Sequence, residues 1–335
     1  MIEFQPMKVA TLVCLCASLL PGLLSAADPP QAEISNGILR ARLYVPYPEI
    51  GYYRATRFDW SGVISSLDYK GHSYFGQWFE KYDPKIHDAI MGPVEEFTTD
   101  GEGFGYAEAK PGGPFLRIGV GVVKKPAQTP TARFFTYDLI DPGRWTIQRG
   151  PDWISFVHEV PATDGYAYVY RKTVRLTKGK PELVLEHSLK NTGQRALETS
   201  VYDHNFFVID NQASGPDFVV KFPFEAKASG DLKDILEVRD REVSYKRKLE
   251  KNETVLTPIT GFGDAAADYN ITVENRKTGA GVRVTGDQPL SRVVFWSASN
   301  VVSPEAYVSL KIAPGQERQW RMTYEFYTLP TNAKQ

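Results

Sequence analysis

Short runs in which hydrophobic and polar residues alternate dominate the chain. A period of two is typical of β-strands with one buried face, and long stretches with helical spacing are nearly absent. Clusters of Gly, Pro, Asn and Asp separate the runs at short intervals, which is the pattern of sandwiches and barrels. The strands expected from this pattern are Ile38–Val45, Phe115–Val123, Trp153–Val160, Tyr166–Leu176, Asp217–Phe222, Tyr269–Glu274, Gly281–Val284, Arg292–Trp296, Tyr307–Ile312 and Trp320–Tyr327.

The stretch from Leu232 to Leu249 is ambiguous, because strong helix formers are mixed with an alternating run, and we expect strand there. No composition break marks a linker, and no repeat or low-complexity tract is evident. The chain has 335 residues, of which 42% are hydrophobic, so it can bury a large core. We therefore predict one all-β domain over residues 27–335, built from two or more large antiparallel sheets.

One expected pair of strands delivers a histidine. Leu183–Lys190 alternates, and Asn191–Gly193 is a hairpin signal because glycine adopts positive φ freely. In the run that follows, one set of side chains points to one face: Ser200, Tyr202, His204 and Phe206. Asp203 points to the other face, so it cannot orient His204 although the two are adjacent.

The N-terminal stretch has the features of an export signal. A lysine precedes the apolar run Val9–Leu24, and Leu24–Ala26 provides a small-residue cleavage site. The run is short and interrupted by proline, so a retained anchor is not expected. We predict a signal peptide over residues 1–26, no membrane anchor after its cleavage, and a periplasmic or secreted protein.

Charge and cysteine content narrow the classes of partner and chemistry. The net charge of -1 argues against nucleic acid or an anionic membrane as a partner. Both cysteines, Cys14 and Cys16, lie inside the predicted signal. The mature chain is therefore expected to have no disulfide, no thiol catalysis and no cysteine-ligated metal.

Two blocks of the chain resemble the galactose mutarotase-like superfamily, which includes aldose 1-epimerases and hexose-6-phosphate epimerases. In that family an Asn-Thr-Gly-type turn precedes a strand that ends in a histidine followed by aromatics, here His204–Phe207. A late glutamate, here Glu305, is followed by a Pro-Gly turn, here Pro314–Gly315. The order and the spacing of about one hundred residues are similar to those of the hexose-phosphate epimerase branch. The resemblance implies a β-supersandwich with a carbohydrate cleft on its concave face.

The resemblance implies that Glu305 and His204 are catalytic. Mutarotation needs a base for the anomeric hydroxyl proton and an acid for the ring oxygen, and carboxylate and imidazole suit these roles. Glu305, Tyr307 and Ser309 share one strand face, which suits a sugar cleft. We expect Glu305 as base and His204 as acid, facing one pocket about 5–7 Å apart. A solvated glutamate and a hydrogen-bonded core histidine are the alternatives.

The chain departs from the family pattern at one place. The family has a second histidine in a His-Gly-Phe-like turn, and here Glu102 stands at that place in Asp100–Tyr106. This departure keeps open a second reading, a sugar epimerase or eliminase that acts on a glycoside or keto-sugar. A third reading is a non-catalytic carbohydrate-binding protein. Each takes a small-molecule carbohydrate, and no cofactor is expected.

Further sugar-binding candidates lie in Gly51–Ile64. Arg57 and Asp59 would share a strand face, where guanidinium and carboxylate groups can hydrogen-bond neighbouring sugar hydroxyls, and an indole can stack on the apolar face of a sugar. A structural salt bridge beside a buried tryptophan is equally compatible with this stretch. The substrate-binding candidates are Arg54, Arg57, Asp59, Trp60, Glu102, Arg117 and Tyr307.

The remaining histidines and aromatics are weaker candidates. His158 and His187 fall among apolar positions and are expected to be buried and hydrogen-bonded, whereas His72 and His87 could reach a cleft from loops. A metal site would need several ligands to converge, and no tight ligand spacing exists, so none is predicted. The weakly suggested ligands are His72, Glu95, Glu96 and His204. The aromatics that could be either stacking platforms or core are Trp78, Tyr82, Trp145 and Trp296.

Overall fold

The computed structural model describes residues 28–132 and 134–330, so the predicted signal peptide with Cys14 and Cys16 lies outside the described residues. Strands dominate the described part, with two short 3₁₀ helices at Ile209–Asn211 and Ala266–Asp268. The strands form sheets of ten, six, four and three members, and neighbours pair antiparallel. The prediction of large antiparallel sheets is confirmed. No helix in the described ranges has the length and apolar character needed to cross a membrane.

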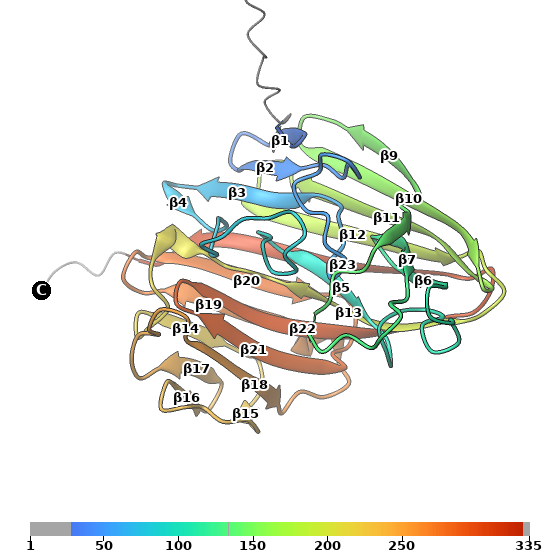
Figure 1. Ribbon diagram of the computed structural model, residues 1–335. Helices are drawn as coiled ribbons and strands as arrows, with labels where there is room; N and C mark the ends of the chain where they lie inside the picture. The colour runs from blue at the N-terminus through green and yellow to red at the C-terminus, as the bar shows by residue number, and fades with distance from the viewer. Residues whose placement is uncertain (1–27, 133, 331–335) are drawn as a thin grey trace, which may run out of the picture.

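The ten-stranded sheet extends along the whole molecule (Figure 1). Its long central strands bury one face almost completely, while their other face is a mixture of buried, half-buried and exposed residues. In spatial order its strands are β16 (Leu236–Arg239), β17 (Glu242–Tyr245), β14 (Phe218–Lys221), β19 (Asn270–Asn275), β20 (Ala280–Gly286), β23 (Glu317–Thr328), β12 (Glu182–Asn191), β11 (Tyr166–Leu176), β10 (Trp153–Thr163) and β9 (Arg144–Arg149).

The six-stranded sheet packs on the ten-stranded one and carries the predicted catalytic residues. Phe97 contacts Tyr170 and Trp320 across the two sheets, with ring centroids 5.3 and 6.2 Å apart. In spatial order its strands are β15 (Lys227–Ala228), β18 (Thr254–Thr260), β21 (Arg292–Ala298), β22 (Val301–Ile312), β13 (Leu197–His204) and β5 (Val94–Thr98).

Two smaller sheets complete the structure. The four-stranded sheet contains β1 (Gln31–Ser35), β2 (Arg40–Tyr44), β3 (Val63–Tyr69) and β4 (His72–Ser73). The three-stranded sheet contains β6 (Pro114–Arg117), β7 (Gly121–Lys124) and β8 (Leu139–Asp141). The largest core cluster includes residues from β1 to β23, so apolar faces from distant parts of the chain share one interior.

The expected hairpin around Asn191–Gly193 is wrong, although both strands are present. β12 pairs with β11 and β23, whereas β13 pairs with β22 and β5, so the turn carries the chain from one sheet to the other. The Asn191 side chain stabilises this crossing: its Nδ2 donates to the carbonyls of Arg195 and Ile312, and its Oδ1 accepts from the Gly193 N–H. An Asx turn thus replaces the hairpin turn.

Two other expected strands have different outcomes in the structure. Leu232–Leu249 forms the β16–β17 hairpin, which confirms the choice of strand. The single strand expected over Phe115–Val123 is wrong, because the chain turns at residues 118–120 and β6 pairs with β7. Gly119 takes φ +76 in this turn, a conformation that glycine adopts without strain.

Gly119 provides a test of close packing. A Cβ at this position would lie 2.5 Å from Oδ1 of buried Asp59, whereas a Cβ at Gly71, which has φ +82, would meet nothing within 4 Å. We expect Gly71→Ala to cost about 1 kcal/mol from its backbone conformation alone, and Gly119→Ala to cost about 1–3 kcal/mol more from overpacking. Urea denaturation of both variants checks this; equal losses would contradict the close contact.

Candidate active site

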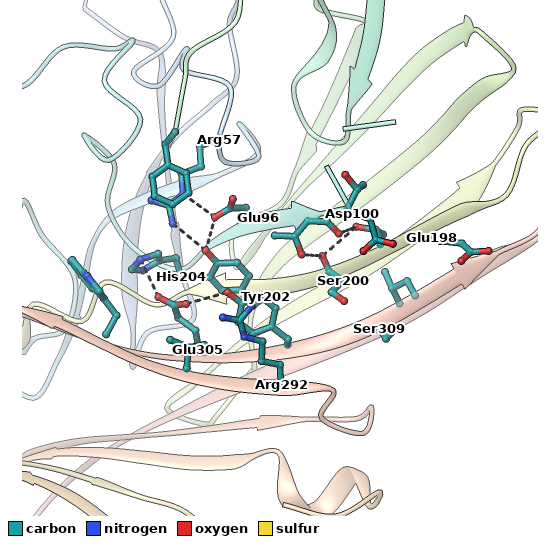
Figure 2. A pocket seen from close by; sticks show the side chains of 18 of the residues that line it. Arg57, Glu96, Asp100, Glu198, Ser200, Tyr202, His204, Arg292, Glu305 and Ser309 are labelled. Carbon is teal, nitrogen blue, oxygen red and sulfur yellow. Dashed lines mark hydrogen bonds and ion pairs between the residues drawn. The ribbon is translucent and has the colours of Figure 1, made fainter. Parts of the chain in front are cut away.

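A cleft of about 620 Å³ lies on the face of the six-stranded sheet that points away from the ten-stranded sheet (Figure 2). This volume falls in the range of small-molecule sites, roughly 300–1,000 Å³. β13 and β22 form the floor, and their alternation sends every second side chain into the cleft. The predicted faces are therefore confirmed. The floor residues are Glu198, Ser200, Tyr202, His204, Glu305, Tyr307, Ser309 and Lys311.

His204 ends β13 and is almost fully buried among aromatic rings. Its imidazole stacks on Phe206 at 3.7 Å, and Trp296 and Phe58 approach it edge-on. Burial, together with the nearby charge of Arg57, lowers the pKa of His204 well below its usual range. The imidazole is therefore neutral at physiological pH.

Ser303 determines which nitrogen of His204 carries the proton. The Ser303 Oγ accepts the backbone N–H of Asn205 at 3.0 Å and lies 2.9 Å from Nδ1 of His204. Because Ser303 is completely buried, its own hydroxyl proton needs an acceptor, and Nδ1 is in position. This assignment leaves the proton on Nε2, which lies 3.3 Å from Oε1 of Glu305.

Glu305 lies beside His204 rather than across a sugar-sized gap. The expected separation of about 5–7 Å is wrong, because the two side chains are in direct contact at 3.3 Å. Burial raises the pKa of Glu305 to about 8, so the carboxyl is mostly protonated at neutral pH. The Tyr307 hydroxyl donates to its Oε2 at 3.3 Å. The two side chains therefore form a neutral pair in direct contact near pH 7.

Arg57 forms the opposite wall with its charge fully satisfied. Its Nε donates to Glu96 at 2.8 Å, its Nη1 contacts Asp88, and its Nη2 donates to the Tyr202 hydroxyl at 3.2 Å. The guanidinium also stacks on Phe134 at 3.7 Å from the ring centroid. Arg57 therefore orders this wall and is not a free cation.

The wall is fixed from beneath by a buried charge network. On β5, Glu96 faces the cleft while Glu95 faces the interior, where it contacts the Lys172 ammonium and lies 2.7 Å from Nε2 of His187. Burial would raise the pKa of Glu95, but Lys172 and His187 outweigh it and hold the pKa at about 2. Lys172 also donates to the carbonyl of Ser61 at 3.0 Å, which secures the loop after Arg57.

The expectation that Arg57 and Asp59 share a strand face is wrong, since both lie in the irregular segment before β3. Arg57 lines the cleft, but Asp59 turns into the core and accepts from Ser61. Trp60 is buried and donates to the carbonyl of Ala55 at 2.8 Å, and Arg54 donates to the carbonyl of Glu49. The structure therefore places Asp59, Trp60 and Arg54 outside the cleft lining.

Glu102 and Arg117 line an adjoining recess that shares Arg57 and Glu96 with the cleft. Glu102 accepts the Tyr137 hydroxyl at 2.8 Å, and Arg117 donates to the carbonyl of Glu102 at 2.8 Å. Neither residue reaches the His204–Glu305 pair in the cleft lining. Tyr307 does line the cleft and stacks on Tyr202 at 4.2 Å.

The other histidines have structural partners. His158 and His187 are buried and hydrogen-bonded as expected. His72 pairs with Asp210 at 2.9 Å, away from the cleft, and His87 contacts Asp88 at the cleft wall without lining it.

The four weakly suggested metal ligands do not converge, and within residues 28–132 and 134–330 no group of three or more His, Cys, Asp or Glu side chains could hold a metal ion. Of the four candidate aromatic platforms, Trp296 lines the cleft. The other three pack elsewhere: Trp78 on Phe206, Tyr82 on Tyr52 and Trp145 on His158.

Several cleft residues were not singled out from the sequence as sugar-binding candidates. Tyr202 could have been found, because it shares the alternating face of His204 two residues away. Arg292 had no such signal, since it comes into the cleft only through the pairing of β21 with β22. The lining residues missed in this way include Asp88, Glu96, Asp100, Glu198, Tyr202, Arg292 and Lys311.

Several solved structures with a similar fold are named as galactose mutarotase-like proteins or as aldose epimerase homologues. No protein-family model and no curated protein matches the sequence. A galactose mutarotase-related enzyme from Lactobacillus acidophilus has 13% identity and a TM-score of 0.52, covering 91% of this chain and all of its own. A galactose mutarotase-like protein from Clostridium acetobutylicum has 11% identity and a TM-score of 0.52, covering 90% and 99%. An aldose epimerase homologue from Caenorhabditis elegans has 13% identity and a TM-score of 0.50, covering 90% and 99%.

The chain has the galactose mutarotase-like fold. At identities near 12% the structural similarity supports the architecture only, so the chemistry has to be argued from the residues of the cleft. This fold is the one that the resemblance in the sequence implied, and it places His204 and Glu305, about one hundred residues apart, on adjacent paired strands.

Proposed function

We propose that the protein is an exported carbohydrate-active enzyme, an aldose mutarotase or epimerase that works by acid–base chemistry at Glu305 and His204. The observation that carries this is the direct contact of a carboxyl and an imidazole at 3.3 Å, both facing one cleft. Perturbed acid–base pairs in clefts are typical of catalytic sites. Export rests on the apolar run Val9–Leu24, which lies outside the described residues.

The geometry suits a reaction at a hemiacetal carbon. The anomeric hydroxyl O1 and the ring oxygen O5 are both bonded to C1, so two side-chain atoms that reach them must themselves lie close together. Ionised Glu305 takes the proton from O1, the C1–O5 bond breaks to the open-chain aldehyde, and Nε2–H of neutral His204 donates a hydrogen bond that stabilises the negative charge developing on O5. Because both side chains lie at the same edge of the sugar, the proton now on Glu305 can pass to O5, and the reverse transfers close the ring on the other face of C1.

Polarimetry tests the proposal. Fresh α-glucose, α-galactose and other aldoses are followed with and without the protein, and we expect at least one sugar to reach its anomeric equilibrium faster than in buffer. Exchange between anomers by NMR is the confirming measurement. If no sugar equilibrates faster but sugars still bind, mutarotation is excluded, and assays on glycosides and keto-sugars then separate an epimerase or eliminase from a non-catalytic carbohydrate-binding protein.

The pH dependence tests the assignment of roles. If Glu305 acts as the base, only its ionised form is active, and kcat/KM should rise about tenfold per pH unit below pH 8 and level off above it. His204 remains neutral across this range because its pKa is lowered. A rate that falls above pH 8 would instead assign protonated Glu305 as the acid.

A further inference from the structure

The cleft continues well beyond the His204–Glu305 pair. It follows β13 and β22, whose residues face one another in register, and Figure 2 shows the side chains spread from His204 at one end to Glu198 at the other. From residue 198 to residue 204 a strand advances about 20 Å, at about 3.3 Å per residue. The facing pairs that line this trough are Tyr202–Tyr307, Ser200–Ser309 and Glu198–Lys311.

The character of the trough changes along its length. At the reacting end the side chains are buried and aromatic, and Trp296 closes one side. At the far end Ser200 is half-buried and Ser309 is exposed, and Thr98 adds a third hydroxyl side chain to the lining. Hydroxyl groups both donate and accept hydrogen bonds, so they match the hydroxyls of further sugar units. A single pyranose at the reacting end would leave this half of the trough without a ligand.

The charges favour a neutral ligand. The ammonium of Lys311 lies 2.8 Å from a carboxylate oxygen of Glu198, so the charges at the far end offset one another. Arg57 is occupied by Glu96 and Asp88. Arg292 also lines the cleft and lies over the ring of Tyr307. The three cations of the lining are outnumbered even without Glu305, because Asp88, Glu96, Asp100 and Glu198 are four carboxylates, so the lining would repel a sugar phosphate or a uronate.

We infer that the trough binds a neutral oligosaccharide, with its reducing end at His204 and Glu305 and the following sugars over Ser200 and Ser309 towards Lys311. The choice of the reacting end rests on the proposed function. The binding of a chain of several sugars rests only on the length, lining and charge of the trough.

Binding measurements test the chain length without relying on catalysis. A neutral-glycan array identifies the linkage that binds, and isothermal titration calorimetry then compares one to five units of that series. We expect affinity to rise at least tenfold from one unit to three or four and then to level off. No binding to any neutral oligosaccharide, or equal affinity for one unit and four, would overturn the inference, whether or not polarimetry detects activity.

A blocking substitution locates the extra sugars. Ser309→Trp fills the middle of the trough, and we expect it to reduce tetrasaccharide affinity to the level of the monosaccharide. Thr146→Trp, at an exposed position of β9 outside the cleft, is the matched control and should bind as the wild type does. If Ser309→Trp binds the tetrasaccharide normally, the chain does not follow β13 and β22.

Discussion

Replacing Lys172 with methionine is expected to destabilise the protein by about 3–5 kcal/mol. The substitution keeps the length of the side chain but removes the ammonium, so the Glu95 carboxylate stays buried without its main counter-charge. Its remaining partner is His187, at 2.7 Å. The loss of the bond to the Ser61 carbonyl also loosens the loop that carries Arg57. Urea denaturation followed by circular dichroism measures the change.

Two variants isolate the charge effect. Lys190→Met removes an exposed lysine from β12 and should change stability by less than about 0.5 kcal/mol. Adding Glu95→Gln to Lys172→Met removes the uncompensated charge, and we expect the double variant to recover part of the loss. A single variant as stable as the wild type would show that the network is not required for the fold.

Replacing Glu305 with glutamine should lower the mutarotation rate by about 10²–10⁴-fold, because an amide cannot accept the proton from the anomeric hydroxyl. Sugar binding should survive, since glutamine keeps the shape and can still hydrogen-bond Tyr307. Glu186→Gln, at a half-buried glutamate of β12 outside the cleft, should retain the wild-type rate. A Glu305→Gln protein with unchanged kcat would remove Glu305 from the mechanism.

The same substitution should increase stability in mild alkali. Burial raises the pKa of Glu305 from 4.5 to about 8, so between these pH values the folded protein holds a proton that the unfolded chain has lost. Stability therefore falls as pH rises through this window, by roughly 2–4 kcal/mol for this group. Glutamine has no such penalty. Thermal unfolding at pH 5 and pH 8.5 should show the gain at the higher pH.

Strands could be predicted where hydrophobic and polar residues alternate because one face of the strand is buried. β11 was placed with both ends correct, and β10, β21 and β23 differ from expectation only in length. Sheet membership was not predictable, because Asn191–Gly193 reads as a hairpin turn although β12 and β13 belong to different sheets. Local sequence specifies the turn, while partners distant in the chain decide the pairing.

In the candidate site, too, local alternation predicted which way strand side chains point, but not the contacts that depend on distant parts of the chain. Tyr307 could be assigned to a polar strand face from alternation, since a strand fixes which way each side chain points, whereas placing His204 in a cleft needed the resemblance to the galactose mutarotase-like family. Arg57 and Asp59 were assigned to one face incorrectly, because they lie in irregular structure that has no period. The contact of His204 with Glu305 and the raised pKa of the carboxyl depend on burial by other strands, which no local pattern records.

Strand β9 closes one end of the ten-stranded sheet, and five of its six residues are exposed. An open edge of this kind could template a second molecule. If two copies paired through β9 in antiparallel register, Arg144 of each would lie opposite Arg149 of the other, and like charges directly opposite one another are unfavourable. The strand is also only six residues long, so a self-paired edge would gain few hydrogen bonds. Both features disfavour pairing of β9 with β9 of a second molecule, and therefore the edge-to-edge association that an exposed strand can cause.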